Sequence, residues 1–287
     1  MHDIFAFSDI HGMWDLYKAI IDYCHEQDSE ATIIFCGDAC DRGPAGYRIM
    51  KELLENPRVI YLKGNHEDMF TKAAREIKEK FSFAESSEKD IKKALIACKY
   101  FDYKYAAIQD SLYNGGLPTL VDWIKDGMPM DFVKQIEDLP LTFSTDTCDF
   151  CHAAGIYKTF KRVADAEYDN VAPDEYASSS LLWSRTAFEY EWAPNRTVIH
   201  GHTPIPYLIE DLNVKWDENK DVQPYKYIGT NSFQMTGAKI DIDTGAAFLG
   251  YAYVLNCLTM KAQGFQDLNV EEDKIKHCIK KIGLIQL

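Results

Sequence analysis

Residues 4–12 read IFAFSDIHG, an apolar run that ends in an aspartate and a histidine, Asp9 and His11. The run predicts a buried strand, and Asp9 could cap a following helix by accepting from its first amides. Side chains two positions apart on an extended chain point to the same side, so Asp9 and His11 could instead bind one metal ion. The pair alone leaves both interpretations open.

Apolar runs recur at residues 32–36 and 59–62, and helix-period stretches follow the runs at 4–7 and 32–36. Strands that alternate with helices predict right-handed crossovers and a mainly parallel sheet. Such sheets place their chemistry at the carboxyl ends of the strands. We therefore expect the polar residues after these runs to lie together.

The rest of the chain changes character twice. Residues 67–138 are helical in pattern and highly charged, with two short helices after residue 117 that Gly127, Met128 and Pro129 divide. A short helix is predicted at 180–188 and a final surface helix at 271–281. Strands are predicted at 141–143, 150–153, 197–200, 207–209, 239–242 and 247–255. We expect one domain, residues 1–287, with a helical insertion at about 67–138.

Composition excludes several classes of protein. The 287 residues are 46% hydrophobic and 13% aromatic, as in soluble globular proteins, and no apolar run reaches the ~18 residues of a membrane span. The N-terminus lacks the pattern of a signal peptide, so we expect a cytoplasmic protein. The net charge of −14 argues against nucleic-acid or membrane binding and requires a local positive centre for any anionic substrate. The eight scattered cysteines are expected to be buried, reduced thiols.

Polar motifs follow five of the predicted strands. Beyond Asp9 and His11 they are GDACDRG at 37–43, KGNHED at 63–68, CHAAG at 151–155 and HGHTP at 200–204. Asp9, Asp38 and Asn65 are each separated by about one strand-helix-strand unit, which brings their strand ends together in one sheet. Oxygen and imidazole ligands suit divalent ions, and two ions bridged by one carboxylate can clamp a reacting phosphorus.

In combination, Asp-x-His, Gly-Asp-x-x-Asp-Arg-Gly and Gly-Asn-His-Glu resemble the signature of calcineurin-like metallophosphoesterases. Arg42-Gly43 and His66-Glu67 are similar to the phosphoprotein-phosphatase branch, which includes bacteriophage lambda protein phosphatase and the symmetrical diadenosine tetraphosphatases. The similarity continues through residues 114–116, 182–185, 201–204 and 242–245, and so spans residues 4 to about 255. It implies an α/β fold, a four-layer β-sandwich flanked by helices.

The resemblance also implies roles, carried over by position. Asp9 and His11 would hold a first divalent metal ion, and Asp38 would bridge to a second. His66 would be the general acid, with Asp41 holding its ring. The remaining ligands of the second ion would be Asn65, His152 and His202, and the groups that bind phosphate would be Arg42, Arg185 and Asn65. The resemblance favours manganese, with iron or zinc as alternatives, and a metal-bridging hydroxide that attacks phosphorus directly.

Two positions leave alternatives open. His200 lies on the same face as His202 and is interpreted as a supporting or core residue. Arg185 could be an ordinary surface arginine. In CHAAG an extra alanine precedes Gly155, which could shift the local turn, although His152 stands before it.

The motif set predicts a phosphatase for phosphate monoesters, with serine/threonine phosphoproteins as the first substrate class. A symmetrical bis(5'-nucleosyl)-tetraphosphatase is the alternative, and either a phosphorylated protein or a small phosphoester would be the partner. A non-catalytic phospho-binding module would lack a ligand or the acid, and none is missing. A nuclease is disfavoured by Pro204, where a histidine is expected, and by the net charge. The oligomeric state stays open.

Overall fold

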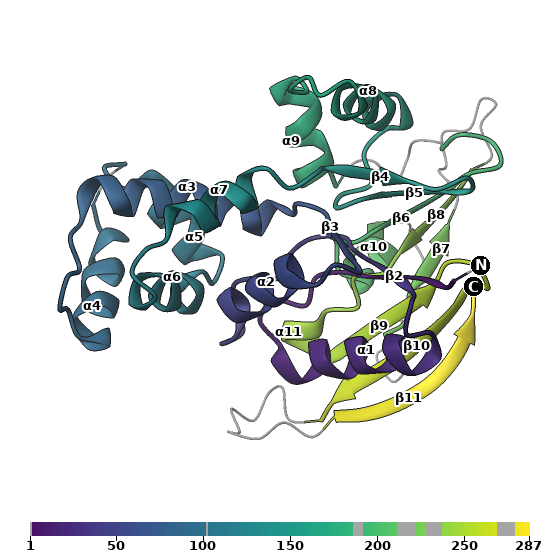
Figure 1. The fold of residues 1–287 in the computed structure, drawn as a ribbon, viewed down its shortest axis with the longest axis horizontal. Helices are drawn as coiled ribbons and strands as arrows, with labels where there is room; N and C mark the ends of the chain where they lie inside the picture. The colour runs from purple at the N-terminus through teal and green to yellow at the C-terminus, as the bar shows by residue number, and fades with distance from the viewer. Residues whose placement is uncertain (1, 102, 186–191, 212–221, 228–236, 269–278) are drawn as a thin grey trace.

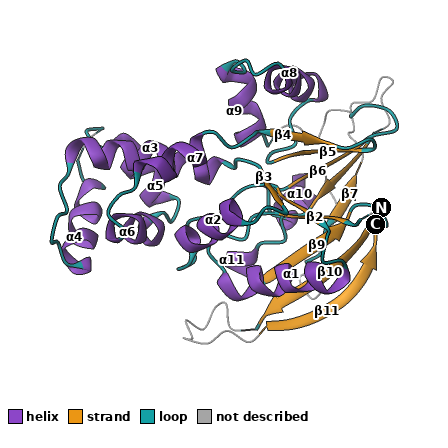
Figure 2. Ribbon diagram, viewed as in Figure 1, coloured by secondary structure: helices purple, strands orange, loops and turns teal. Residues whose placement is uncertain are grey.

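The computed structural model describes residues 2–101, 103–185, 192–211, 222–227, 237–268 and 279–287. Within these ranges the strands form two mixed sheets, which Figure 2 shows with helices on their outer sides. The two sheets and their helices determine which residues meet at the functional site.

The first sheet runs in the order β11-β10-β9-β1-β2-β3. Its parallel half comprises the three strands predicted from the apolar runs, namely β1 (Ile4–Phe7), β2 (Thr32–Phe35) and β3 (Val59–Tyr61). Its antiparallel half comprises β9 (Tyr251–Asn256), β10 (Lys261–Asp267) and β11 (Ile279–Gln286). The prediction of a mainly parallel sheet is thus correct only for the half that carries the motifs.

The second sheet runs in the order β4-β5-β6-β8-β7 and is also mixed. Its centre is parallel and is built from β5 (Cys148–Cys151), β6 (Thr197–His200) and β8 (Ala238–Asp241). Its edges, β4 (Thr142–Ser144) and β7 (Tyr225–Tyr227), are antiparallel. In both sheets the motifs therefore follow neighbouring parallel strands.

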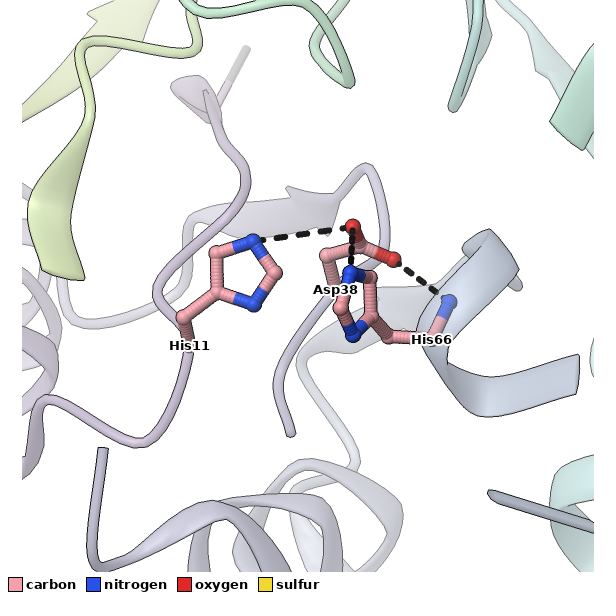
Figure 3. Close-up of side chains that lie close together, drawn as sticks. All are labelled: His11, Asp38 and His66. Atoms are coloured by element: carbon pink, nitrogen blue, oxygen red, sulfur yellow. Dashed lines mark hydrogen bonds and ion pairs between the residues drawn. The ribbon is translucent and has the colours of Figure 1, made fainter. Parts of the chain in front are cut away.

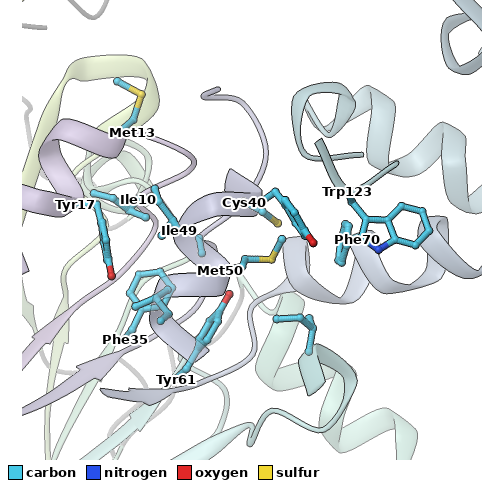
Figure 4. Packing of buried hydrophobic residues seen from close by; sticks show 14 of the residues in the cluster. Ile10, Met13, Tyr17, Phe35, Cys40, Ile49, Met50, Tyr61, Phe70 and Trp123 are labelled. Carbon is cyan, nitrogen blue, oxygen red and sulfur yellow. The ribbon is translucent and has the colours of Figure 1, made fainter. Parts of the chain in front are cut away.

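Alternation along the strands builds the layers. Ala6 and Ile34 face Phe150 and Ile199 of the other sheet and form the core between the sheets. The opposite side chains of β1 and β2 pack beneath α1 (Trp14–Gln27) and α2 (Gly46–Glu55), in the cluster drawn in Figure 4. The far face of the second sheet packs on α8 (Tyr157–Tyr168) and α9 (Glu175–Trp183). This is the four-layer α/β sandwich that the sequence predicts.

A lobe of helices follows β3 and projects to one side of the sheets (Figure 1). It comprises α3 (Asn65–Lys80), α4 (Glu88–Cys98), α5 (Ala106–Tyr113), α6 (Leu117–Lys125) and α7 (Met130–Glu137). The break between α6 and α7 falls at Gly127, whose φ of 87° suits glycine, and Met128 follows with φ 57°. Helical character at 67–138 and the two short helices after residue 117 are confirmed.

One predicted strand is wrong, a second is correct only in its later part, and one predicted helix falls mostly outside the described residues. Residues 207–209 belong to a helix, α10 (Ile205–Asp211), because Ile205 and Leu208 are buried at helical spacing while Tyr207 is exposed. The strand predicted at 247–255 is instead a short helix, α11 (Ala246–Leu249), followed by β9, with a break at Gly250. The helix predicted at 271–281 lies outside the described residues up to 278, and Ile279 begins a strand.

We propose that the chain forms one domain, because strands from both ends of the chain are hydrogen-bonded neighbours in the first sheet. The cysteines in the described ranges are buried and free of disulfides. Cys148 and Cys151 lie in different cores and so do not form a site together. None of the described helices is long and apolar enough to cross a bilayer.

Asp149 ties the second sheet to the segment before β6. Its carboxylate accepts from Trp192 Nε1 at 2.9 Å and from Arg196 Nε at 2.9 Å, and Asp149 is 2% exposed. We expect Asp149→Ala to lower the free energy of unfolding by about 2–4 kcal/mol, because it leaves the buried indole N–H of Trp192 without its acceptor and removes the carboxylate that pairs with the partly exposed guanidinium of Arg196. Denaturant unfolding measures this change.

The control for this substitution is Asp165→Asn, which removes an exposed pair with Lys161 on α8. An exposed pair of this kind contributes about 0.5 kcal/mol or less. Equal effects of the two substitutions would contradict the structural role assigned to Asp149.

Candidate metal centre

The motif residues follow parallel strands of both sheets and meet between the sheets' carboxyl ends. Asp9 and His11 follow β1, Asp38 follows β2, and Asn65 and His66 open α3 directly after β3. From the second sheet, His152 follows β5 and His202 follows β6. All these side chains are buried, at 6% exposure or less.

The loops that carry them have an unusual backbone. Positive φ angles of 44° to 72° occur at Asp9, His11, Asp38, Asp41, Arg42 and His202. A non-glycine residue in this region costs of order 1–2 kcal/mol, although Asp and His tolerate it better than most residues. The loops are held by hydrogen bonds to one another, from Asp9 N to Gly37 O and from His11 N to Asp38 O, both 3.0 Å. Strain of this kind is typical of functional sites.

Figure 3 shows the first group of potential ligands, His11, Asp38 and His66. Nε2 of His11 lies 3.7 Å from Oδ2 of Asp38, and Nε2 of His66 lies 3.8 Å from the same oxygen. Asp9 borders this group, with Oδ1 3.9 Å from Nε2 of His11. Nδ1 of His11 lies 2.9 Å from the Cys40 carbonyl and donates to it, which leaves the lone pair of Nε2 directed at the carboxylates.

The second group shares Asp38 and adds His152 and His202. Nε2 of His152 lies 3.4 Å from Oδ1 of Asp38, while Nδ1 lies 2.8 Å from the Cys36 carbonyl. Oδ1 of Asn65 lies 2.8 Å from His152 Nε2 and 3.0 Å from His202 Nδ1. Asp38 thus has one carboxylate oxygen on each side, toward two sets of imidazoles.

The residues present fit divalent metal ions. Burial lowers the pKa of His11, His152 and His202, which keeps these imidazoles in the neutral form that binds metal. Burial and the neighbouring Asp243 and Asp38 raise the pKa of Asp9, so its carboxylate requires a nearby cation to be ionised. Nε2 of His202 is buried without a hydrogen-bond partner. Oxygen and nitrogen lone pairs that converge in this way are a typical metal site.

A comparison with protein-family models matches residues 2–225 to the calcineurin-like phosphoesterases. The chain belongs to this family. No curated protein sequence matches it significantly. The expected family resemblance is therefore confirmed. Membership implies divalent metal ions, which the buried His and Asp groups described above could bind.

Solved structures whose chain path is similar to that of this protein include the following three, each with a TM-score of 0.43. A protein assigned as a diadenosine tetraphosphatase is 14% identical, with 98% of this chain and 93% of the other covered. A protein serine/threonine phosphatase from Saccharomyces cerevisiae is 14% identical, with 100% and 81% covered. A cold-active protein-tyrosine phosphatase from Shewanella is 12% identical, with 92% and 77% covered. At these identities and TM-scores, the similarity to these structures gives no evidence about the function of this chain.

In this phosphoesterase His66 differs from His11 and His152, because its Nδ1 contacts a carboxylate and theirs contact backbone carbonyls. The ring is 2.8 Å from Oδ2 of Asp41, a residue that is fully buried. Burial opposes protonation, but the carboxylates of Asp38 and Asp41 outweigh it and raise the pKa of His66. The contact fixes Nδ1 as a donor, which directs Nε2 toward the centre.

Arg42 reaches both histidines of the first group. One guanidinium nitrogen contacts Nε2 of His11 and the other lies 3.2 Å from Nε2 of His66. The exposed ring of Phe248 lies 4.7 Å from the guanidinium carbon and supports its other side. A metal ion at Nε2 of His11 requires this guanidinium to turn away from that atom.

The structure also locates Arg185 and His200, the two positions for which the sequence left alternatives open. Arg185 is exposed and lies near enough to act on buried groups: after burial and His152, its charge contributes to the lowered pKa of His202. His200 is fully buried, and burial lowers its pKa to about 3. Its Nδ1 lies 3.1 Å from the Gly201 carbonyl, and His200 belongs to neither group of potential ligands described above.

Two buried carboxylates of the site carry no role in the sequence interpretation. Glu67 accepts from the amides of Asp38 and Gly64 at 2.8 Å and from Ala39 at 2.7 Å, and so fixes the loop that presents Asp38. Asp243 follows β8, and burial raises its pKa to about 6 while Arg42 opposes the shift. Glu67 lies in the GNHE motif and Asp243 in the similar segment 242–245. These motif positions are the sequence signal by which both residues could have been assigned to the site.

Glycines permit the close approach of these loops. A Cβ on Gly201 would lie 2.0 Å from Oδ2 of Asp9, and one on Gly64 would lie 2.2 Å from Oδ1 of Asp38. A side chain at either position would displace a candidate ligand. The glycines of GNHE and HGHTP are therefore part of the site's geometry.

We expect Mn(II) to stabilise this phosphoesterase, because the ion offsets the repulsion among buried carboxylates. At 100 times its dissociation constant a ligand adds about 2.7 kcal/mol, which for a chain of this size raises the Tm by roughly 5–10 °C. Calorimetry of chelator-treated protein with and without Mn(II) measures the shift. Asp38→Asn should lose most of it and the exposed control Asp138→Asn should keep it. An unchanged shift in Asp38→Asn would exclude the proposed centre.

We expect Glu67→Gln to weaken Mn(II) binding about 10- to 100-fold, because an amide NH₂ would face backbone donors and release the Asp38 loop. Isothermal titration measures the dissociation constant. Glu167→Gln is the matched control, since Glu167 accepts from the Leu141 and Thr142 amides beside β4 instead. Equal weakening in both variants would indicate a general loss of stability.

Proposed function

We propose that this chain is a binuclear-metal-dependent phosphatase that hydrolyses phosphate monoesters, with phosphoserine and phosphothreonine in proteins as its substrates. The observation that carries the proposal is the position of Asp38 between two imidazole groups, 3.7 Å from His11 and 3.4 Å from His152. One carboxylate that faces two ligand sets suits a bridge between two ions.

In this proposal Asp9, His11 and Asp38 hold the first ion. The second is held by Asp38, Asn65, His152 and His202. The ligands are oxygens and imidazoles without a thiolate, which suits Mn(II) and also admits iron or zinc. When bound, the ions would acidify water at the site and offset the charge of the phosphoryl group.

The chain's own residues supply binding and proton transfer. Arg42 and Arg185 would hold phosphate oxygens through their planar guanidinium groups, and the amide of Asn65 would assist. His66, held at Nδ1 by Asp41, would donate its Nε2 proton to the leaving oxygen. Poor leaving groups such as the serine and threonine alkoxides need this proton most, which supports the choice of substrate.

The geometry argues against a non-catalytic phospho-binding module. Such a module needs phosphate contacts but neither an acid nor a second ligand set. Here the His66 ring is buried against Asp41, and the second group with His202 is present as well.

The test is Mn(II)-dependent phosphate release from a phosphothreonine peptide and from diadenosine tetraphosphate, measured side by side. We expect faster turnover of the peptide and a loss on the order of 100-fold or more in Asp38→Asn, since the variant loses the shared ligand. Asp138→Asn should match the wild type.

The outcomes separate the candidate functions. Faster turnover of diadenosine tetraphosphate would assign the chain to nucleotide hydrolysis instead. Activity on neither substrate, with Mn(II) bound, would overturn both enzymatic assignments and favour the phospho-binding module.

A further inference from the structure

Asp41 and Arg42 are consecutive residues with left-handed backbone, at φ 70° and 63°. Two such residues in a row are strained and need outside contacts to persist. The strained pair also carries two proposed functions, since Asp41 holds His66 and Arg42 faces the phosphate site. Contacts that hold the backbone of Asp41 and Arg42 therefore position both the proposed acid, His66, and the guanidinium proposed to bind phosphate.

Both backbone amides of the pair are bound by the helical lobe. The Asp41 amide donates to the hydroxyl oxygen of Thr119, on α6, at 3.0 Å. The Arg42 amide donates to the carbonyl of Gly115, in the turn before α6, at 2.9 Å. Thr119 is 1% exposed, so no water can replace its hydroxyl easily.

Gly115 approaches Arg42 in a way that only glycine allows. Its φ is 91°, and a Cβ there would lie 3.0 Å from both the amide nitrogen and Cγ of Arg42. The turn itself is tied to α5, because Gly116 N donates to the Ser111 carbonyl at 2.8 Å. The contact is thus built into the turn between α5 and α6.

The same lobe carries the other side of the His66–Asp41 contact. His66 lies in the first turn of α3, where the lobe begins, and α3 packs against α5 and α6. The lobe therefore positions the His66 imidazole through α3 and the backbone of Asp41 through Thr119 on α6. This arrangement gives a role to a region that the sequence marks only as an insertion.

We propose that Thr119 and Gly115 are positioning residues, through which the helical lobe sets the geometry of Asp41 with His66 and of Arg42. The proposal rests on the proposed phosphatase function, in which His66 protonates the leaving oxygen. Thr119 positions the proposed acid, His66, by holding Asp41. Gly115 positions the guanidinium proposed to bind phosphate by holding the backbone of Arg42.

Thr119→Val tests the first part, because it removes the acceptor while keeping a β-branched side chain. A displaced acid slows only substrates whose leaving group needs a proton. We expect kcat for a phosphothreonine peptide to fall about 10- to 100-fold, and kcat for p-nitrophenyl phosphate, whose leaving group needs no proton, to fall less than about threefold. Thr119→Ser should restore the wild-type ratio.

The matched control is Thr71→Val, which removes a buried hydroxyl from α3 that donates to the Asp68 carbonyl within the same helix. It should leave the ratio of the two rates unchanged. If Thr119→Val slows both substrates equally, the effect is a loss of folded enzyme and the positioning role is wrong. A wild type inactive on both substrates would instead overturn the phosphatase function itself.

Amide hydrogen exchange gives a readout that does not need activity. In Thr119→Val the amide of Asp41 should exchange at least about tenfold faster than in the wild type and in Thr71→Val. Gly115→Ala should raise the inhibition constant of inorganic phosphate about tenfold, because the new Cβ displaces Arg42. Unchanged exchange at Asp41, or unchanged inhibition by phosphate in Gly115→Ala, would overturn the corresponding half of the proposal.

Discussion

The carboxylate of Asp38 depends on a short loop that the fold must hold in a strained conformation. The residue has a φ of 65°, its amide donates to Glu67, and its Oδ1 accepts from the His66 amide at 3.0 Å. These contacts join the loop after β2 to the first turn of α3. Because both groups of potential ligands share Asp38, a shift of this loop would separate them at once. The buried Glu67 is not a candidate ligand, but it is as important to the centre as the ligands because it holds the loop that presents Asp38.

The two-sheet architecture explains how distant motifs meet. Each sheet contains three neighbouring parallel strands, so the carboxyl ends of β1, β2 and β3 lie beside one another, as do those of β5, β6 and β8. Packing the sheets face to face then brings His152 and His202 to the loops of the first sheet. The hydrogen bond from His202 N to Oδ2 of Asp9, 3.0 Å long, joins the two halves directly. The first sheet carries the candidate ligands Asp9, His11 and Asp38, whereas the second group of potential ligands needs residues from both sheets.

Sequence patterns predicted the parts of this molecule that short-range physics determines. Apolar runs located β1, β2 and β3, and the motifs after them located the candidate ligands. The segment 207–209 looked like a strand because tyrosine and isoleucine favour strands, but the burial of Ile205 and Leu208 at helical spacing selects a helix. Thr119 could not have been found, since its role depends on a contact with Asp41 across 78 positions of sequence.

The net charge sets a condition that the local structure has to meet. At −14 the chain repels a phosphorylated substrate at long range, and screening limits this repulsion to about 10 Å at ordinary salt. Within that distance the field near the centre comes from Arg42, Arg185 and whatever cations the buried carboxylates bind. The acidic residues Asp9, Asp38 and Asp243 therefore serve the binding of an anion only when metal ions outweigh them. In the proposed function, occupancy of the metal centre and affinity for phosphate are thus coupled by electrostatics, independently of any catalytic step.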